Sequence, residues 1–148
     1  MSWVFLLKNK VVVGSIIEKM VIEIKIQFSI TIKLVRFDNA WELCTHRLHS
    51  FYKSHDIIHQ TTCICSSQQN GVAERKHRHL LDVARTLLIH HSVPQLYWGD
   101  AVLTAYYLIN RMPNSILHEQ IPWHTLYPER ELFHVPSRIF GCVAFVHL

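Results

Sequence analysis

The feature of this sequence that most constrains its fold is a pair of helical patterns that follow each other between residues 71 and 112. In the first pattern, small and apolar residues recur at helical spacing on one face: Ala73, Leu80, Ala84, Leu87 and Leu88. The second pattern is apolar nearly all round, with Ser92 as its expected N-cap, Pro94 in its first turn and Pro113 after its end. We therefore expect two helices, the second of them well buried.

Upstream of these helices, strand and helix patterns alternate. A run of apolar residues favours a buried strand over residues 3–7. Apolar residues spaced by three and four favour a helix over residues 11–28, although their Val and Ile content leaves a strand open. Residues 31–37 and 57–62 have strand patterns, and residues 43–55 between them have a helical one. This order of elements predicts an α/β layered domain.

Two segments of the chain show neither pattern. Residues 63–71 are polar and rich in turn-forming residues, which predicts an exposed loop ahead of the long helix. The last part of the chain contains Pro122, Pro128 and Pro136, so we expect it to be irregular before a final strand-like stretch over residues 139–147.

The composition is that of a globular chain with the length of one ordinary domain. Of its 148 residues, 49% are apolar and 18% are charged. The predominantly apolar stretch Ala101–Asn110, which contains no charged residue or His, has about half of the roughly 20 residues that a membrane helix needs. The apolar run at the start is short and has no basic leader, so it is not a secretory signal. We expect an intracellular protein.

The charge balance favours a polyanionic partner. The formal net charge is +4, and 12 His residues add positive charge below about pH 6.5. A solvated surface is the alternative explanation of so small an excess. The four Cys residues include no C-x-x-C pair, and we expect buried or half-buried free thiols, with Cys142 packed in the last strand.

Two carboxylates lie at positions suited to metal chemistry. Asp38 ends a predicted strand and Glu74 lies in the first turn of a predicted helix, with 35 residues between them. Hard divalent ions prefer oxygen ligands, and a pair of such ions can drive phosphoryl transfer. Pairs of Asp and Glu at arbitrary spacing are common, so the spacing by itself leaves a purely structural role open.

Several motifs together resemble the integrases of copia-type retrotransposons. The stretch Ser66–Arg78, S-S-Q-Q-N-G-V-A-E-R-K-H-R, resembles the loop and helix that carry the catalytic Glu of that family. Further matching motifs occur in the family's order: Trp3–Lys8, Ile32–Asn39, Tyr97–Ala101, Tyr107–Pro113 and Phe140–Cys142. The resemblance covers essentially the whole chain.

The resemblance implies a ribonuclease-H-like core with a catalytic triad of Asp, Asp and Glu, in which Asp38 and Glu74 match the second and third members. It implies that these residues bind Mg²⁺ or Mn²⁺, that water trims DNA 3′ ends, and that the freed hydroxyl attacks target DNA. The family's first Asp precedes the segment that Trp3 matches. We therefore expect a core truncated at its N-terminus and lacking its first catalytic strand, over residues 1–113, with a C-terminal extension over residues 114–148.

The resemblance also implies contacts with DNA. Arg78 follows Glu74 by four residues and shares its helix face, near the reacting DNA end. Arg75 and Lys76 make the helix start cationic, and the preceding loop approaches DNA with Gln68, Gln69 and Asn70. The expected partners are element ends, target DNA and a second copy in a homo-oligomer, with no membrane. A functional protein would act in the nucleus.

Other interpretations stay open. The chain is alternatively a catalytically inactive remnant that binds DNA or protein, or a fragment that does not fold alone. Zinc binding is a third hypothesis, because the side chains of His55, His59, Cys63 and Cys65 are of ligand type, although their spacing fits no standard finger. The remaining expectations concern position only: His46, His49, His90 and His91 at the surface, and Trp98, Tyr106 and Tyr107 in the core or on a partner face.

Overall fold

The chain folds into helices and one small sheet, grouped in two compact units. The computed structural model describes residues 1–37, 43, 45–61, 71–143 and 145. One unit, the mixed unit, is Leu6–Arg75; the other, the helical unit, consists of Met1–Phe5 and Lys76–Leu148. Helices and strands thus occur together, as the α/β pattern predicted, and both strands found in the described residues lie in the mixed unit.

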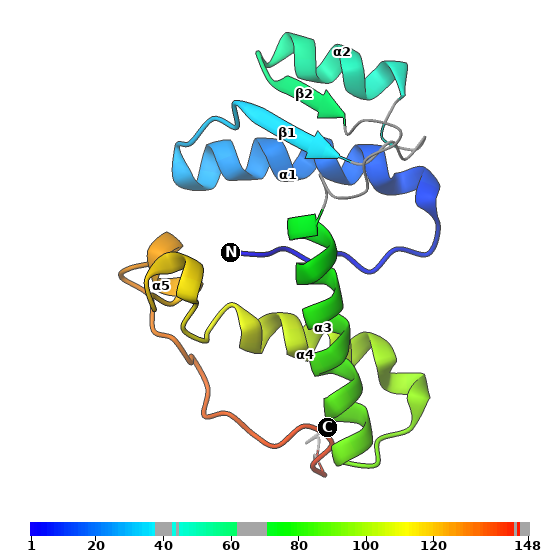
Figure 1. Cartoon of the computed structure of the whole chain (residues 1–148), viewed down its shortest axis with the longest axis vertical. Helices are drawn as coiled ribbons and strands as arrows, with labels where there is room; N and C mark the ends of the chain where they lie inside the picture. Colours follow the sequence, from blue (N-terminus) through cyan, green and yellow to red (C-terminus); the bar gives the residue numbers. More distant parts are fainter. Residues whose placement is uncertain (38–42, 44, 62–70, 144, 146–148) are drawn as a thin grey trace. The chain divides into compact units, whose positions relative to one another are not determined.

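The mixed unit alternates helices and strands in the predicted order. A short 3-10 turn, η1 (Lys10–Val12), leads into α1 (Val13–Phe28), which is followed by β1 (Leu34–Phe37), α2 (His46–Ser54) and β2 (Ile58–Thr61). The two strands pair in parallel, from Leu34 opposite Ile58 to Phe37 opposite Thr61 (Figure 1). The helical interpretation of residues 11–28 is confirmed.

Strand alternation explains where the core of the mixed unit lies. Val35 and Phe37 face one side of the sheet and pack with α1 and α2 around the buried Val21, Leu48 and Tyr52. The other side carries Leu34 and Ile58, which are 43% and 60% exposed. One face of the sheet is therefore covered by the two helices, as expected for period-two patterning.

Polar contacts fix α2 against α1. The Thr45 hydroxyl accepts a hydrogen bond from the Leu48 amide at 3.4 Å, which caps the start of α2. Arg47 then makes a two-pronged ion pair with Glu18 of α1, with its Nη2 2.6 Å from Oε2 and its Nε 2.9 Å from Oε1. Leu48 also packs over Gly14 of α1, with its side chain 3.5 Å from where a Cβ would stand, an ordinary contact distance.

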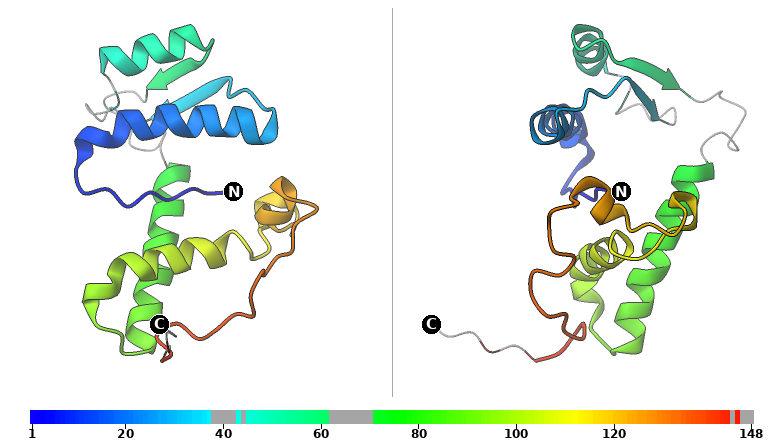
Figure 2. Two further views of the ribbon diagram at one scale, coloured as in Figure 1. Left: turned by 180° about the vertical axis from the view of Figure 1, so that it is seen from behind. Right: turned by 90° about the vertical axis from the view of Figure 1, so that its left-hand side faces the viewer.

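The helical unit is built on α3 (Gly71–His90) and α4 (Trp98–Ile109), which cross steeply (Figures 1 and 2). Helix α3 is continuous and begins in the mixed unit. Ala84 on α3 meets Ala101, Val102 and Ala105 on α4, and small residues allow this close approach. The connection contains η4 (Gln95–Tyr97), and η5 (Ser115–Leu117) and α5 (Pro122–Leu126) follow.

Two polar side chains directly after α4 hold the N-terminal segment and the chain around Leu132. Asn110, 1% exposed, accepts a hydrogen bond from the Ser2 amide and donates one to the Ser2 carbonyl, both at 2.9 Å. The Arg111 guanidinium lies between the rings of Tyr107 and Trp123, at 3.6 and 3.9 Å from their centroids, and its Nε donates to the Leu132 carbonyl at 2.7 Å.

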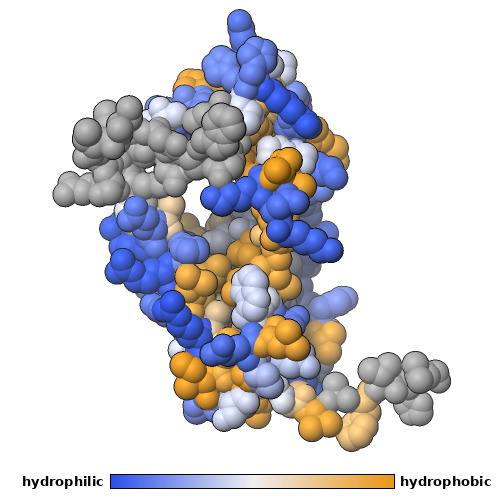
Figure 3. Space-filling view, turned by 90° about the vertical axis from the view of Figure 1, so that its right-hand side faces the viewer, coloured by the Kyte–Doolittle hydropathy of each residue, from blue (hydrophilic) through white to orange (hydrophobic). Residues whose placement is uncertain are grey.

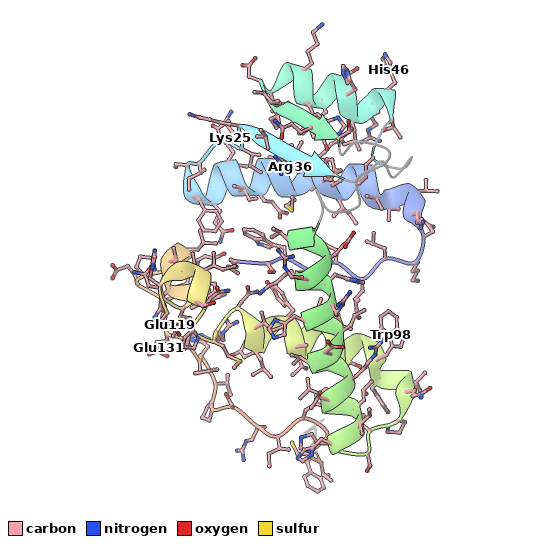
Figure 4. All side chains as sticks on the ribbon, viewed as in Figure 1. Lys25, Arg36, His46, Trp98, Glu119 and Glu131 are labelled. Carbon is pink, nitrogen blue, oxygen red and sulfur yellow. The ribbon has the colours of Figure 1, made fainter. Side chains whose placement is uncertain are left out.

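The predicted start of the second helix is wrong, whereas its predicted burial is confirmed within α4, where Ala101, Val102, Ala105 and Ile109 are buried. Ser92 has φ 50° and donates its amide to the Ile89 carbonyl, while the Val93 amide bonds to Leu88, so these residues close α3 and do not cap α4. Pro94 has ψ 143° and lies ahead of η4. Trp98, in the first turn of α4, is 58% exposed (Figure 4).

The strand expected over residues 3–7 is also wrong, and the one expected over residues 139–147 is absent from the described part of that stretch. Residues 3–7 and residues 139–143 belong to no strand in the described part of the chain. Just ahead of residues 3–7, the Asn110 side chain bonds both the amide and the carbonyl of Ser2. Gly141 turns the chain with φ 82°, and Cys142 is exposed instead of packed. Cys44, Cys63 and Cys65 lie outside the described residues.

Large apolar side chains are common at the surface. Figure 3 shows hydrophobic residues mixed with hydrophilic ones over the visible face. Val11, Leu96 and Ile116 are each more than four-fifths exposed, as is Phe145 beyond the last turn. Pro122, expected in irregular chain, instead opens the short helix α5 and is buried. No helix in the described residues has both the length and the apolar character needed to cross a membrane.

Candidate nucleic-acid interface

The start of α3 presents four of the candidate residues. The helix begins at Gly71, and Glu74 lies in its first turn, where the partial positive charge of the helix end favours a carboxylate. Glu74, Arg75 and Arg78 are exposed, and Lys76 is half-buried. The guanidinium of Arg75 folds back over the helix start, with Nη1 3.2 Å from where a Cβ of Gly71 would stand.

The charged groups at the start of α3 are available to a ligand. In the described part of the chain, Glu74, Arg75 and Arg78 form no ion pair, whereas Arg47 pairs with Glu18 and Arg85 pairs with Asp82. Because the intervening positions carry the exposed His77 and His79, five successive side chains from residue 75 onward are basic or can become so. Basic side chains therefore gather at a helix N-terminus, whose free amide groups also attract anions.

The two strands direct their carboxyl ends to one edge of the sheet. Phe37 ends β1 directly before Asp38, and its partner Thr61 ends β2 ahead of the segment that contains Gln68, Gln69 and Asn70. Asp38 and those three polar residues lie outside the described residues. The meeting of Asp38 with Glu74 therefore stays a prediction.

The described residues do not by themselves make a metal centre. No group of three or more His, Cys, Asp or Glu side chains within them is close enough to hold an ion. Of the four residues considered for zinc binding, Cys63 and Cys65 lie outside the described residues. His55 Nδ1 lies 3.0 Å from the Phe51 carbonyl, and His59 packs its ring against the sheet-facing core.

A buried polar pair in the mixed unit was not expected from the sequence. The rings of Tyr52 and His59 lie 5.4 Å apart, and neither the Tyr52 hydroxyl nor His59 Nε2 has a hydrogen-bond partner among the described residues. Burial, with a smaller contribution from the negative charge of Glu18, raises the pKa of Tyr52 to about 12. Helical spacing identified Tyr52 as a core residue, but nothing in the sequence indicated an unpaired hydroxyl.

The positions expected for other His and aromatic residues agree in part with the structure. The expected surface positions of four histidines are confirmed: His46, His49, His90 and His91 are exposed. Tyr106 and Tyr107 are half-buried in the helical unit, while Trp98 faces solvent. Burial raises the pKa of the Tyr106 hydroxyl above its ordinary value.

Comparison with solved structures defines the class of fold. No protein-family profile matches the chain. The fold is similar to that of a chain in the cryo-EM structure of the simian T-cell lymphotropic virus intasome in complex with PP2A regulatory subunit B56 gamma. The TM-score is 0.58 at 15% sequence identity, over 89% of this chain and 46% of that chain. The chain therefore has a fold of the type found in a retroviral intasome.

Comparison of sequences adds the particular group of relatives. The chain is 34% identical over 146 residues to a retrovirus-related Pol polyprotein from transposon TNT 1-94 of Nicotiana tabacum, covering 99% of this chain. It is 35% identical over 146 residues to the corresponding polyprotein from transposon RE2 of Arabidopsis thaliana. The chain spans about a tenth of the length of these relatives: 11% and 10%. The chain is thus related over nearly its whole length to the Pol polyproteins of copia-type retrotransposons, the group that its motifs predicted.

Proposed function

We propose that this chain contributes to DNA integration, as part of the catalytic core of a retrotransposon integrase. One observation carries the proposal: α3 begins with an exposed carboxylate followed by exposed basic side chains that form no ion pairs in the described residues. Phosphate groups are the partners that such a helix start attracts. The relationship to Pol polyproteins and the intasome-type fold are consistent with it.

The finer architecture belongs to the same proposal. We take residues 1–113 as part of a ribonuclease-H-like core and residues 114–148 as its extension. The parallel pairing of β1 and β2, with helices on one face of the sheet, supports such a core. We extend the proposal to action on chromosomal DNA in the nucleus and to assembly with further copies of the chain; the likeness to a chain of an intasome is consistent with such an assembly.

In this proposal, Asp38 and Glu74 hold Mg²⁺ or Mn²⁺. The Glu74 carboxylate is exposed and free of ion pairs within the described residues, so its oxygens are available to a hard cation. Asp38 follows the end of β1 directly. A bound pair of such ions would supply activation of a water or hydroxyl and stabilisation of the leaving oxygen. The task of the chain's own residues is to hold these carboxylates in place.

The DNA contacts would come from two neighbouring segments. Arg75, Lys76 and Arg78 would bind phosphates from α3, with Arg78 one turn beyond Glu74. Gln68, Gln69 and Asn70 would approach the DNA from the segment before the helix. Amide side chains in that segment can donate to phosphate and base edges without adding charge.

A second candidate function is a catalytically inactive remnant that binds DNA or protein. It is favoured by the exposed basic side chains of Arg75 and Arg78, which can bind phosphate without a metal. The two candidates differ in what Glu74 does. Phosphate binding by Arg75 and Arg78 needs no carboxylate, whereas metal-dependent strand transfer does.

Binding of a fluorescent DNA duplex to the full chain, at fixed salt concentration, tests the proposal. We expect the Arg75→Gln and Arg78→Gln substitutions each to weaken binding. The matched control is Arg85→Gln, an exposed residue on the same helix that is paired with Asp82. Equal affinities for all of these variants and the wild type would contradict a DNA-binding role. Glu74→Gln separates the two candidates: retention of Mn²⁺ binding in this variant would exclude the metal site.

A further inference from the structure

A groove in the helical unit lies apart from the start of α3. It has a volume of about 490 Å³ and is bounded by the C-terminal halves of α3 and α4 and by the segment from Val135 to Phe140. That volume is within the range of small-molecule sites. The segment that closes it runs outside these helices in two views (Figures 1 and 2).

Two contacts hold the closing segment in place. Phe140 packs against the core cluster formed by α3 and α4. The next residue, Gly141, passes so close to the end of α3 that a Cβ on it would lie 2.6 Å from Val93 Cγ2. At φ 82° a side chain would also be strained there. The outer wall of the groove is thus tied to the helices at Phe140 and Gly141.

The walls of the groove are mostly apolar. Their aliphatic and aromatic side chains are Leu87, Leu108, Val135, Pro136, Ile139 and Phe140. Among the polar lining residues, Thr104 already donates its hydroxyl to the Asp100 carbonyl at 2.8 Å. The ring of Tyr107 carries the Arg111 guanidinium at 3.6 Å from its centroid. The Thr104 hydroxyl and the Tyr107 ring therefore already have partners, and Ser137 is the remaining uncharged polar residue of the lining.

The charge at the groove has one sign. His90, His91 and Arg138 line it, and no Asp or Glu does. Arg138 forms no ion pair in the part of the chain that the structure describes. His90 and His91 are exposed and stack edge-to-face with ring centroids 4.8 Å apart. An anion at the rim would meet three potential cations and no repelling carboxylate.

We propose that this groove binds a small apolar anion, specifically an aromatic carboxylate. Its ring would lie in the groove against the apolar walls. Its carboxylate would bind Arg138, with His90 or His91 next to the carboxylate. A polyanion such as DNA does not fit this chemistry, because the apolar walls would oppose its charged backbone. A neutral apolar ligand would leave Arg138 without a partner. The proposal does not depend on the DNA-binding role of α3.

The test uses the full chain and 2-naphthoate, with 2-naphthylmethanol as the neutral probe of the same shape. We expect naphthoate to bind about fivefold more tightly than the alcohol, the upper range for an ion pair in a partly exposed site. Arg138→Gln should reduce this preference to within about twofold, while Arg130→Gln, whose guanidinium stacks on Tyr127, should leave it unchanged. Ile139→Gln, at an exposed position, should weaken both probes.

Three results would overturn the inference. The first is equal binding of acid and alcohol by the wild-type chain, which would leave non-specific apolar adsorption. The second is an unchanged preference in Arg138→Gln, which would place the anion elsewhere. The third is unchanged binding of both probes by Ile139→Gln. Thermal unfolding of each variant checks that a loss of binding is not a loss of fold.

Discussion

Replacement of Tyr52 by Phe should stabilise the mixed unit. Tyr52 is 2% exposed and its hydroxyl has no hydrogen-bond partner among the described residues, so folding removes that group from water without compensation. An unsatisfied buried polar group costs about 1–3 kcal/mol, and Phe keeps the ring and its contacts with Phe37 and Phe51. We expect the free energy of unfolding to rise by about 1 kcal/mol.

The pH dependence of the free energy of unfolding gives a second test, because the direction of the change can be predicted. The folded-state pKa of Tyr52 is raised from 10.0 to about 12, so the folded chain keeps this proton while the unfolded chain loses it. Its contribution to stability is complete below pH 10 and is lost as the pH rises toward 12. The loss is about 1.3 kcal/mol between pH 9 and pH 11.

Urea unfolding of wild type and Tyr52→Phe at pH 7, 9 and 11 measures both the gain in stability and its dependence on pH. The difference between the two proteins isolates Tyr52 from the other groups that titrate there. We expect the advantage of the variant to grow from pH 9 to pH 11. A variant that is less stable than wild type at pH 7, or a difference that does not change with pH, would refute the reasoning.

Three further predictions concern other contacts. Asn110→Ala removes both hydrogen bonds to Ser2 and should lower the free energy of unfolding by about 2 kcal/mol, measured by urea unfolding; an unchanged value would mean that the N-terminal segment is held elsewhere. Gly141→Ala should lower the unfolding temperature, and adding Val93→Ala should recover part of the loss; no recovery would contradict the close approach. If Asp38 and Glu74 bind Mn²⁺, a concentration ten times the Kd should stabilise wild type by about 1.4 kcal/mol, and neither Asp38→Asn nor Glu74→Gln should respond.

Much of the element order could be predicted from the sequence, because periodic patterns record which face of an element is buried. The spacing of Leu48, Phe51 and Tyr52 located α2, and the apolar face from Leu80 to Leu88 located the core side of α3. The helix over residues 11–28 formed despite its β-branched residues, because its three- and four-residue spacing places Ile17 and Val21 against the core.

The errors occurred where tertiary contacts override local preference. Ser92 is a good N-cap by type, but the chain uses it at φ 50° to end α3. Apolar residues 3–7 look like a strand, yet the partner of Ser2 is the side chain of Asn110, more than a hundred positions away. Such a partner leaves no periodic signal near either residue.

The sequence predicted which residue types make up the candidate site. The structure describes the positions of only some of these residues. Local signals were enough to place Glu74, Arg75 and Arg78 on one helix start, because helix N-termini and charge runs are read from neighbouring residues. The convergence of Asp38 with Glu74 depends on how distant segments meet. No local pattern encodes that meeting, and the sequence reached it only through the resemblance to integrases.

The salt dependence of DNA binding tests the central claim most directly. Each phosphate that a basic side chain neutralises contributes about 0.9 to the slope of log K against log salt concentration for duplex DNA. The double variant Arg75→Gln/Arg78→Gln should therefore have a slope shallower by about 1.8 than wild type, whereas Arg85→Gln should keep the wild-type slope. A double variant with the wild-type slope would contradict the assignment of α3 as the DNA-binding element.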